Sequence, residues 1–297
     1  IEIAATGLNY RDVMWAMGIL PEEALETGFV GPTLGLECAG RVARVGSTVT
    51  KVAIGDTVIA FGPASFSTHL VIDEGWVSLV PNEMPPAQAA TLPVSYFTAQ
   101  YALSYLGRLE ADETVLIHGG AGGVGLAAIS LAQSVGARVI ATAGSPVKQK
   151  FLKELGVDHV LSSRNMDFAS AVRKITDGQG VDVVLNSLAG PAMEASLALL
   201  RPYGRFLELG KKDYYSNTSV GLHALKNNIS YFGVDIDSLL ADRPKIAKTV
   251  LADVMSRVKN GQFSPLPMTV FDADNAPEAF RLMQRSGQIG KIVITPP

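Results

Sequence analysis

The segment that most constrains the fold is a glycine-rich turn, Gly120-Ala121-Gly122-Gly123-Val124-Gly125, which satisfies the pattern G-x-G-x-x-G. The pattern alone is weak, but here it follows the apolar run 114–118 and opens the helical stretch 123–135, within a βαβ unit of about 30 residues. Such glycines permit a tight turn and close approach of the backbone to a pyrophosphate, and the helix N-terminus adds N–H groups and partial positive charge. The alternative is a turn that binds nothing. The residues expected to bind a dinucleotide are Gly120, Gly122, Gly123, Val124 and Gly125.

From residue 114 onward, short apolar runs alternate with helical stretches. The expected strands that follow the first are 138–142, 159–161, 181–186 and 204–209. The expected helices between them are 146–155, 167–176 and 191–200. This βαβ rhythm predicts an α/β domain with a doubly wound, Rossmann-type parallel sheet.

The first 90 residues have a different pattern, because short β-rich runs are punctuated there by glycine and aspartate. Examples are 40–46, 52–60 and 66–72. These runs predict a compact, mostly antiparallel β domain. Prolines 81, 85 and 86 mark a boundary, after which 87–106 is predicted to be helical.

The tail of the chain, 290–294, is predicted to be a strand that returns to the first domain. That domain is then discontinuous. The predicted division is a substrate domain of 1–92 and 263–297 and a nucleotide domain of 93–262. A length of 297 residues agrees with about two domains. The chain opens at Ile1 inside an expected strand, which we interpret as a segment of a longer protein.

Composition excludes several classes of function. The 25 basic and 28 acidic residues give no electrostatic case for nucleic acid or for an anionic membrane surface. Apolar runs stay below about 18 residues, because the longest candidate is broken by Gln133 and Arg138, so we expect no membrane span. The single cysteine, Cys38, excludes a disulfide framework and a zinc site of several thiolates. The four histidines are scattered, so we expect no metal, and we expect a cytoplasmic location.

The end of the second strand of the nucleotide domain decides between the two nicotinamide cofactors. An NAD site usually carries an acidic residue about 20 positions after the glycine turn, which bonds the ribose 2′-hydroxyl. The stretch 141–148 has no carboxylate but contains Ser145 and Lys148. We therefore predict NADPH, with Ser145 and Lys148 at the 2′-phosphate and Arg164 as a further candidate. The alternative for Lys148 is a solvated helix residue.

The order of these parts, together with a set of local motifs, resembles a known family. The motifs are Gly7-Leu8-Asn9-Tyr10-Arg11-Asp12-Val13, Gly35-Leu36-Glu37-Cys38-Ala39-Gly40, His118-Gly119 before the glycine turn, Ser162-Ser163-Arg164, Leu185-Asn186-Ser187-Leu188-Ala189-Gly190 and Phe206-Leu207-Glu208-Leu209-Gly210-Lys211-Lys212-Asp213. They resemble the zinc-free branch of the medium-chain dehydrogenase/reductase superfamily. Within this branch, the motifs resemble those of the enoyl reductase domains of polyketide synthases and animal fatty acid synthase. The sequence is similar to that of mycobacterial synthases of the mycocerosic-acid and phthiocerol type.

The resemblance covers the chain apart from the family's first strands, and it implies that the β domain is GroES-like. Zinc-dependent relatives carry a histidine at the position of Leu36 and a lobe of four cysteines, and both are missing here. The implied activity is NADPH-dependent reduction of the α,β double bond of an enoyl thioester on an acyl carrier protein, during polyketide or fatty acid chain extension. The implied partners are that carrier and the neighbouring domains of a multidomain synthase.

The resemblance also implies roles for particular residues. In the family a lysine and an aspartate some two dozen residues later have been proposed as proton donors, and they match Lys211 and Asp235. Lys211 follows a strand end, where ligands of such sheets bind. The alternative is that Lys211 binds only cofactor or water, because an ordinary lysine is a weak acid near neutral pH. The residues implied at the cofactor are Asn9 and Thr98 at the nicotinamide, Asn186 and Ser187 at the ribose or pyrophosphate, and Gly210.

One departure from the family bears on stereochemistry. Related reductases often carry a tyrosine in a Gly-x-Tyr-Pro segment near the substrate α-carbon, whereas this chain reads Gly18-Ile19-Leu20-Pro21. Leu20 has no proton to donate. An α-methyl branch is therefore expected to have the configuration made by family members that lack the tyrosine.

Two other functions stay open from the sequence. One is a free-standing NADPH quinone or enal oxidoreductase of the same superfamily, and the other is an NADPH-binding protein with low turnover. Measured turnover separates them. The resemblance also implies a homodimer, because related domains often pair through an edge strand, and the stretch 228–234 is the candidate for that strand.

Overall fold

The computed structural model describes residues 1–81 and 83–296, which form two compact units. One unit comprises Ile1–Phe97 and Ile236–Pro297, and the other comprises Thr98–Asp235. The second boundary lies at 236 rather than at the expected 263, because the helices α10 (Ile236–Asp242) and α11 (Pro244–Lys259) group with the first unit. Met255 of α11 packs against the apolar core of that unit, which explains the earlier boundary.

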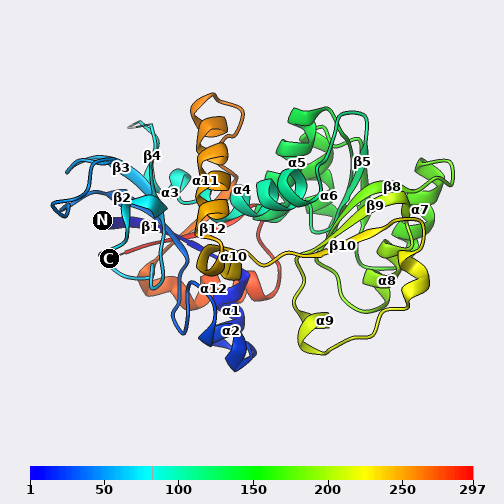
Figure 1. Ribbon diagram of the computed structural model, residues 1–297, viewed down its shortest axis with the longest axis horizontal. Helices are drawn as coiled ribbons and strands as arrows, with labels where there is room; N and C mark the ends of the chain where they lie inside the picture. The colour runs from blue at the N-terminus through cyan, green and yellow to red at the C-terminus, as the bar shows by residue number, and fades with distance from the viewer. Residues whose placement is uncertain (82, 297) are drawn as a thin grey trace. The chain divides into compact units, whose positions relative to one another are not determined.

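The second unit contains a six-stranded parallel sheet with the order β10-β9-β8-β5-β6-β7 (Figure 1). Its strands are β5 (Thr114–Ile117), β6 (Arg138–Ala143), β7 (His159–Ser162), β8 (Val181–Asn186), β9 (Leu200–Glu208) and β10 (Ser230–Gly233). The order reverses between β5 and β8, which is the switch point at which ligands of doubly wound sheets bind. The predicted Rossmann-type sheet is confirmed.

Apolar runs explain why these strands lie inside the unit. Every residue of β8 is buried, as expected for a central parallel strand covered on both faces. The helices α7 (Asp167–Ile175) and α8 (Pro191–Leu197) pack on the sheet through Phe168, Val172 and Met193. Besides these, the unit contains α5 (Gly123–Val135), α6 (Pro146–Glu154), α9 (Lys212–Tyr215), the π-helix η2 (Gln100–Leu106) and the short helix η3 (Leu222–Leu225).

Local signals set the helix ends that position the site. α5 begins directly after Gly122 and ends before Gly136, whose φ of 87° closes the helix in the left-handed conformation that glycine favours. Ser145 caps α6 through its side chain, and Pro146 occupies the first turn, where a missing N–H is tolerated.

Two predicted helices are shorter than expected. The stretch 87–106 divides into α3 (Pro86–Ala89), α4 (Pro93–Ala99) and η2, because Pro93 cannot continue a preceding helix. The stretch 191–200 ends at 197, because β9 already begins at Leu200.

The first unit contains a six-stranded sheet with the order β11-β12-β1-β2-β3-β4. Its strands are β1 (Glu2–Leu8), β2 (Glu37–Arg41), β3 (Thr57–Phe61), β4 (Val77–Leu79), β11 (Met268–Asp272) and β12 (Lys291–Thr295). Neighbours are antiparallel except β11 and β12. The returning tail is confirmed, since β12 pairs with β1 at Thr6↔Ile294. The run 66–72 is not a strand and touches β1 by one isolated bridge, Glu2↔His69.

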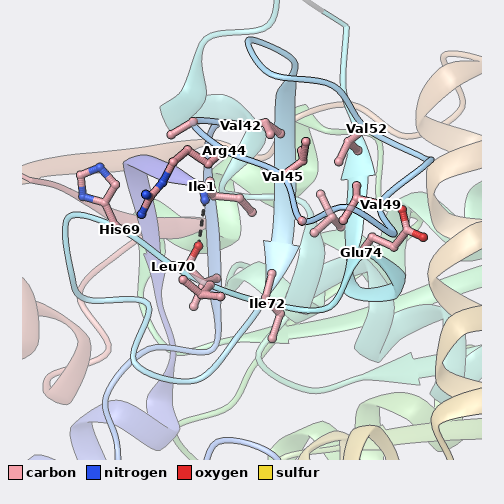
Figure 2. A pocket seen from close by; sticks show the side chains of 14 residues that line it. Ile1, Val42, Arg44, Val45, Val49, Val52, His69, Leu70, Ile72 and Glu74 are labelled. Carbon is pink, nitrogen blue, oxygen red and sulfur yellow. Dashed lines mark hydrogen bonds between the residues drawn. The ribbon is translucent and has the colours of Figure 1, made fainter.

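Helices complete the first unit: α1 (Tyr10–Ala16), α2 (Glu22–Glu26), α12 (Ala276–Gln284) and the short helices η1 (Glu74–Trp76) and η4 (Ala273–Asn275). This unit also has a hollow of about 230 Å³ (Figure 2). Beside it the Ile1 ammonium donates to the carbonyl of Leu70 at 2.8 Å. Its lining is mostly apolar and, among the described residues, includes none of the predicted site residues, so it has no part in the candidate site. Within the described part of the chain, no helix combines the length and apolar character needed to cross a membrane.

Candidate functional site

The predicted site residues of the second unit lie where its parallel strands end. Because all six strands run in the same direction, their carboxyl ends share one edge of the sheet. The residues at this edge are the glycine turn after β5, Ser145 after β6, Arg164 after β7, Ser187 after β8, Gly210 and Lys211 after β9, and Asp235 after β10.

The glycine turn is closed tightly against itself. Gly119 has a φ of 65°, and the Gly120 N–H donates to the Thr142 carbonyl at 2.9 Å. A Cβ on Gly125 would lie 2.3 Å from the Gly119 carbonyl oxygen, so this position accepts only glycine without movement of the turn. The first N–H groups of α5 have no partner within the helix and are available to an anion. The turn therefore fits a pyrophosphate.

Two cationic side chains, Lys148 and Arg164, follow the ends of β6 and β7 at the same edge of the sheet. The charge of Arg164, after burial, is the second cause that lowers the pKa of Lys148, which indicates that the two positive groups repel each other. Arg164 Nε donates to the Gly144 carbonyl at 2.8 Å, and a Cβ on Gly144 would lie 2.9 Å from that nitrogen. The Ser145 hydroxyl accepts from the Lys148 backbone N–H at 3.4 Å. A cation pair of this kind fits a phosphate group.

Lys211 and Asp235 form an ion pair, with Lys211 Nζ 2.9 Å from Asp235 Oδ2. The ammonium also donates to the Val234 carbonyl at 3.1 Å and lies 5.8 Å from the centre of the Tyr214 ring. The two side chains keep 25% and 45% of their surface exposed, so an incoming molecule has access to both. The structure thus brings together two residues that are 24 positions apart in the sequence.

A residue that sequence reasoning did not assign is Glu208, the buried last residue of β9. Its Oε2 accepts from Asn186 Nδ2 at 2.6 Å, and its Oε1 accepts from the Gly210 backbone N–H at 2.6 Å. Burial raises the pKa of Glu208 to about 7, against the lowering effect of these two hydrogen bonds. A carboxylate at the end of an apolar strand is the signal that points to it.

The structure places the predicted Asn186 inside the protein, with its side-chain amide already engaged. Nδ2 donates to both Glu208 and the Leu188 carbonyl, and Oδ1 accepts from the Leu188 N–H at 3.2 Å. This amide therefore holds the strand end together, and its contact with a cofactor stays a prediction. Ser187 is exposed, and its hydroxyl lies 3.3 Å from where a Cβ on Gly119 would be, so it borders the glycine turn.

The predicted residues outside the sheet edge have other surroundings. Asn9 Nδ2 donates to Glu37 Oε1 at 2.9 Å, and Asn9 Oδ1 accepts from Lys291 Nζ at 2.6 Å. Lys291 also forms a buried ion pair with Glu37 at 2.5 Å. The Asn9 amide is thus held by a charged pair that sequence reasoning did not identify. Leu20 is half-buried and belongs to the segment that connects α1 to α2. Thr98 is a buried residue of α4.

His118 and Cys38 are both buried and serve packing. His118 Nδ1 lies 3.0 Å from Thr142 Oγ1 and Nε2 lies 2.8 Å from Ser196 Oγ, and burial lowers the pKa of the imidazole to about 4. Burial raises the pKa of the Cys38 thiol to about 12, so the thiolate form is absent near neutral pH. Among residues 1–81 and 83–296 there is no group of three or more His, Cys, Asp or Glu side chains placed to hold a metal ion.

Comparison with known proteins adds independent information. The alcohol dehydrogenase GroES-like domain family matches residues 1–82, and the zinc-binding dehydrogenase family matches residues 123–252. A phenolphthiocerol/phthiocerol polyketide synthase polypeptide of Mycobacterium tuberculosis is 44% identical over 299 residues, which are 100% of this chain and 13% of that protein. Highly-reducing polyketide synthase 1 of Aureobasidium melanogenum is 41% identical over 300 residues, again 100% of this chain and 13% of the relative. Among solved structures, CurK enoyl reductase superposes with a TM-score of 0.92 at 38% identity, covering 100% of this chain and 90% of that one.

Proposed function

Because the chain belongs to the enoyl reductase domains of polyketide synthases, in the medium-chain dehydrogenase/reductase superfamily, we propose that it reduces the α,β double bond of an acyl thioester with NADPH. The chain spans 13% of the length of the two curated relatives named above, so the carrier and the order of reactions around it are part of the proposal. The observation that carries the proposal is the Lys211–Asp235 pair, which lies at the same sheet edge as the glycine turn.

The residues of the second unit fit NADPH. Bound NADPH supplies a hydride to the β-carbon of the enoyl thioester. The N–H groups at the start of α5 would bind the pyrophosphate, and the absence of a Cβ at Gly125 lets the turn pack closely on the helix that carries them. Lys148 and Arg164 bind the 2′-phosphate, with Ser145 capping the helix beside them.

Lys211 and Asp235 then complete the reduction. Negative charge develops on the thioester oxygen as the β-carbon gains hydride, and a nearby ammonium stabilises that enolate. The α-carbon must next gain a proton from a donor within hydrogen-bond reach, directly or through a water. Lys211 holds such a proton on Nζ, and Asp235 keeps the ammonium in place through the 2.9 Å contact.

The test is NADPH oxidation with a 2-enoyl thioester of pantetheine or of acyl carrier protein, measured beside NADH and a simple quinone. The proposal expects fast reduction of the thioester with a preference for NADPH. Oxidation with the quinone but not with the thioester would instead assign the chain to the quinone and enal oxidoreductases. Tight NADPH binding without turnover on either substrate would favour the binding protein with low turnover.

The cation pair makes a prediction about cofactor choice. Lys148→Ala and Arg164→Ala are each expected to raise the KM for NADPH about tenfold, because a charge-assisted hydrogen bond contributes roughly 1.5–3 kcal/mol. The KM for NADH stays within about twofold, because NADH lacks the 2′-phosphate. Steady-state kinetics with both cofactors measure the difference.

Lys150→Ala is the matched control, because Lys150 lies on the same helix, is 78% exposed and pairs with Glu154. Its KM values are expected to equal those of the parent. Equal losses of NADPH and NADH affinity in the Lys148 and Arg164 variants would contradict the assignment of the 2′-phosphate.

Leu20 makes a prediction about stereochemistry. With a 2-methyl enoyl thioester, the product is expected to carry the configuration made by tyrosine-lacking reductases, because Leu20 has no proton to deliver to the α-carbon. An excess of at least about tenfold corresponds to a difference of roughly 1.4 kcal/mol between the two transition states. Chiral chromatography of the product measures the excess, and a product of the tyrosine type would overturn the prediction.

The proposed partners are an acyl carrier protein that delivers the enoyl thioester and the neighbouring domains of a synthase. The strand β10 is the outermost of its sheet, at the edge where the sequence suggested a homodimer. The homodimer itself stays a prediction.

A further inference from the structure

The tips of β8 and β9 are joined by one carboxylate. Glu208 accepts the Asn186 side-chain N–H on one oxygen and the Gly210 backbone N–H on the other, each at 2.6 Å. Position 210 favours glycine, because a Cβ there would lie 2.7 Å from Glu208 Oε1. The next residue after Gly210 is Lys211. The position of the lysine backbone is therefore set by a bond between its neighbour and a buried group.

We propose that Glu208 is a positioning residue for Lys211, whose carboxylate ties the Gly210 amide to Asn186 and so holds the Lys211 ammonium beside Asp235. The inference rests on the proposed role of Lys211 as proton donor. It assigns no contact between Glu208 and substrate, because the carboxyl group is buried and both of its oxygens are engaged.

The surroundings of Glu208 make its charge sensitive to pH. Burial and, to a smaller extent, the nearby charge of Asp213 disfavour the carboxylate, whereas the two hydrogen bonds and the charge of Lys211 favour it. The phenol groups of Tyr214 and Tyr231 also interact with it from α9 and β10. A carboxylate accepts at both oxygens, whereas a protonated carboxyl has one oxygen acting as a donor. Protonation therefore weakens the link between Asn186 and Gly210.

The decisive variant is Glu208→Gln, which keeps the shape of the side chain. One oxygen can still accept from the Gly210 N–H, but the new NH₂ group faces the NH₂ group of Asn186, and two donors cannot bond. We expect kcat with a 2-enoyl thioester to fall about tenfold at pH 8.5, with the Kd for NADPH within about twofold. At pH 5.5 the parent has lost its own carboxylate, so the difference from the variant is expected to shrink to about twofold.

A second variant tests the link itself and guards against misfolding. Glu208→Asp keeps the carboxylate but shortens the side chain by one methylene group, so it cannot reach both the Asn186 amide and the Gly210 N–H, and we expect kcat at pH 8.5 to fall although the negative charge is retained. Glu154→Gln, an exposed change of the same type as Glu208→Gln, is expected to behave as the parent. A loss in Glu208→Gln that is the same at all pH values, or a Glu208→Asp variant as active as the parent, would overturn the proposal.

Failure of this inference is distinguishable from failure of the proposed function. If the parent does not reduce the thioester, the proposed function fails, and a crystal structure of the Glu208→Gln variant then tests the geometry alone. The inference expects Lys211 Nζ beyond hydrogen-bond reach of Asp235 Oδ2 in that structure. A pair retained at 2.9 Å would overturn it.

Discussion

Gly125→Ala is expected to weaken NADPH binding by at least about 100-fold and to abolish turnover under ordinary assay conditions. The added Cβ would lie 2.3 Å from the Gly119 carbonyl oxygen and 2.7 Å from the Gly120 Cα. Both are backbone atoms, so the turn must open to admit the methyl group. Opening moves the N–H groups at the start of α5 away from the pyrophosphate, and overpacking of this kind costs roughly 1–3 kcal/mol of stability. Fluorescence titration with NADPH and a thermal melt measure the two effects separately.

Two other glycines separate the local effect from general destabilisation. Gly156 has a φ of 85° with nothing within 4 Å of a Cβ, so Gly156→Ala is expected to lower stability by about 1 kcal/mol while NADPH binding stays unchanged. At Gly46 a Cβ likewise meets nothing within 4 Å, and Gly46→Ala is expected to behave as the parent. If Gly125→Ala lost stability but bound NADPH normally, the turn would not be the pyrophosphate site.

The fold was predictable to the extent that short-range patterns determine it. The glycine turn, the apolar run of β8 and the caps of α6 each act within about ten residues, and the strand order follows from the doubly wound topology. The β-rich run 66–72 is not a strand, because β-rich composition does not ensure a partner strand: the segment pairs with β1 at a single bridge. The shortened helices show the same limit, since Pro93 and the start of β9 end them.

The site was predictable where a residue follows a parallel strand, because all such ends share one edge. That rule brought Lys211, Ser187 and Asp235 to the same edge. The same rule does not predict which polar side chains are already hydrogen-bonded to other residues of the protein. The amides of Asn186 and Asn9 are occupied by Glu208 and by the Glu37–Lys291 pair, in contacts between residues that lie 22, 28 and 282 positions apart. Such long-range pairing has no local signature in the sequence.

Lys211→Met is expected to lower kcat for a 2-enoyl thioester about 100-fold, the lower end of what a positioned proton donor contributes. Methionine keeps most of the aliphatic stem and removes the ammonium, so the enolate loses a cation and the α-carbon loses a donor. The Kd for NADPH is expected to stay within about threefold, because the pyrophosphate and 2′-phosphate groups are bound elsewhere along the sheet edge. Stopped-flow measurement of NADPH oxidation gives the rate of the chemical step directly.

Asp235→Asn separates holding the ammonium from supplying the proton. If Asp235 acts by holding Lys211 at 2.9 Å, Asp235→Asn is expected to lower kcat by about tenfold. The variant that combines Asp235→Asn with Lys211→Met is then expected to be no slower than Lys211→Met alone. If both residues donated protons independently, the losses would multiply. Lys150→Met is the control for removing an exposed ammonium and is expected to match the parent. A Lys211→Met variant within about threefold of the parent would exclude the lysine as donor, and multiplicative losses would give the carboxyl group of Asp235 a role of its own.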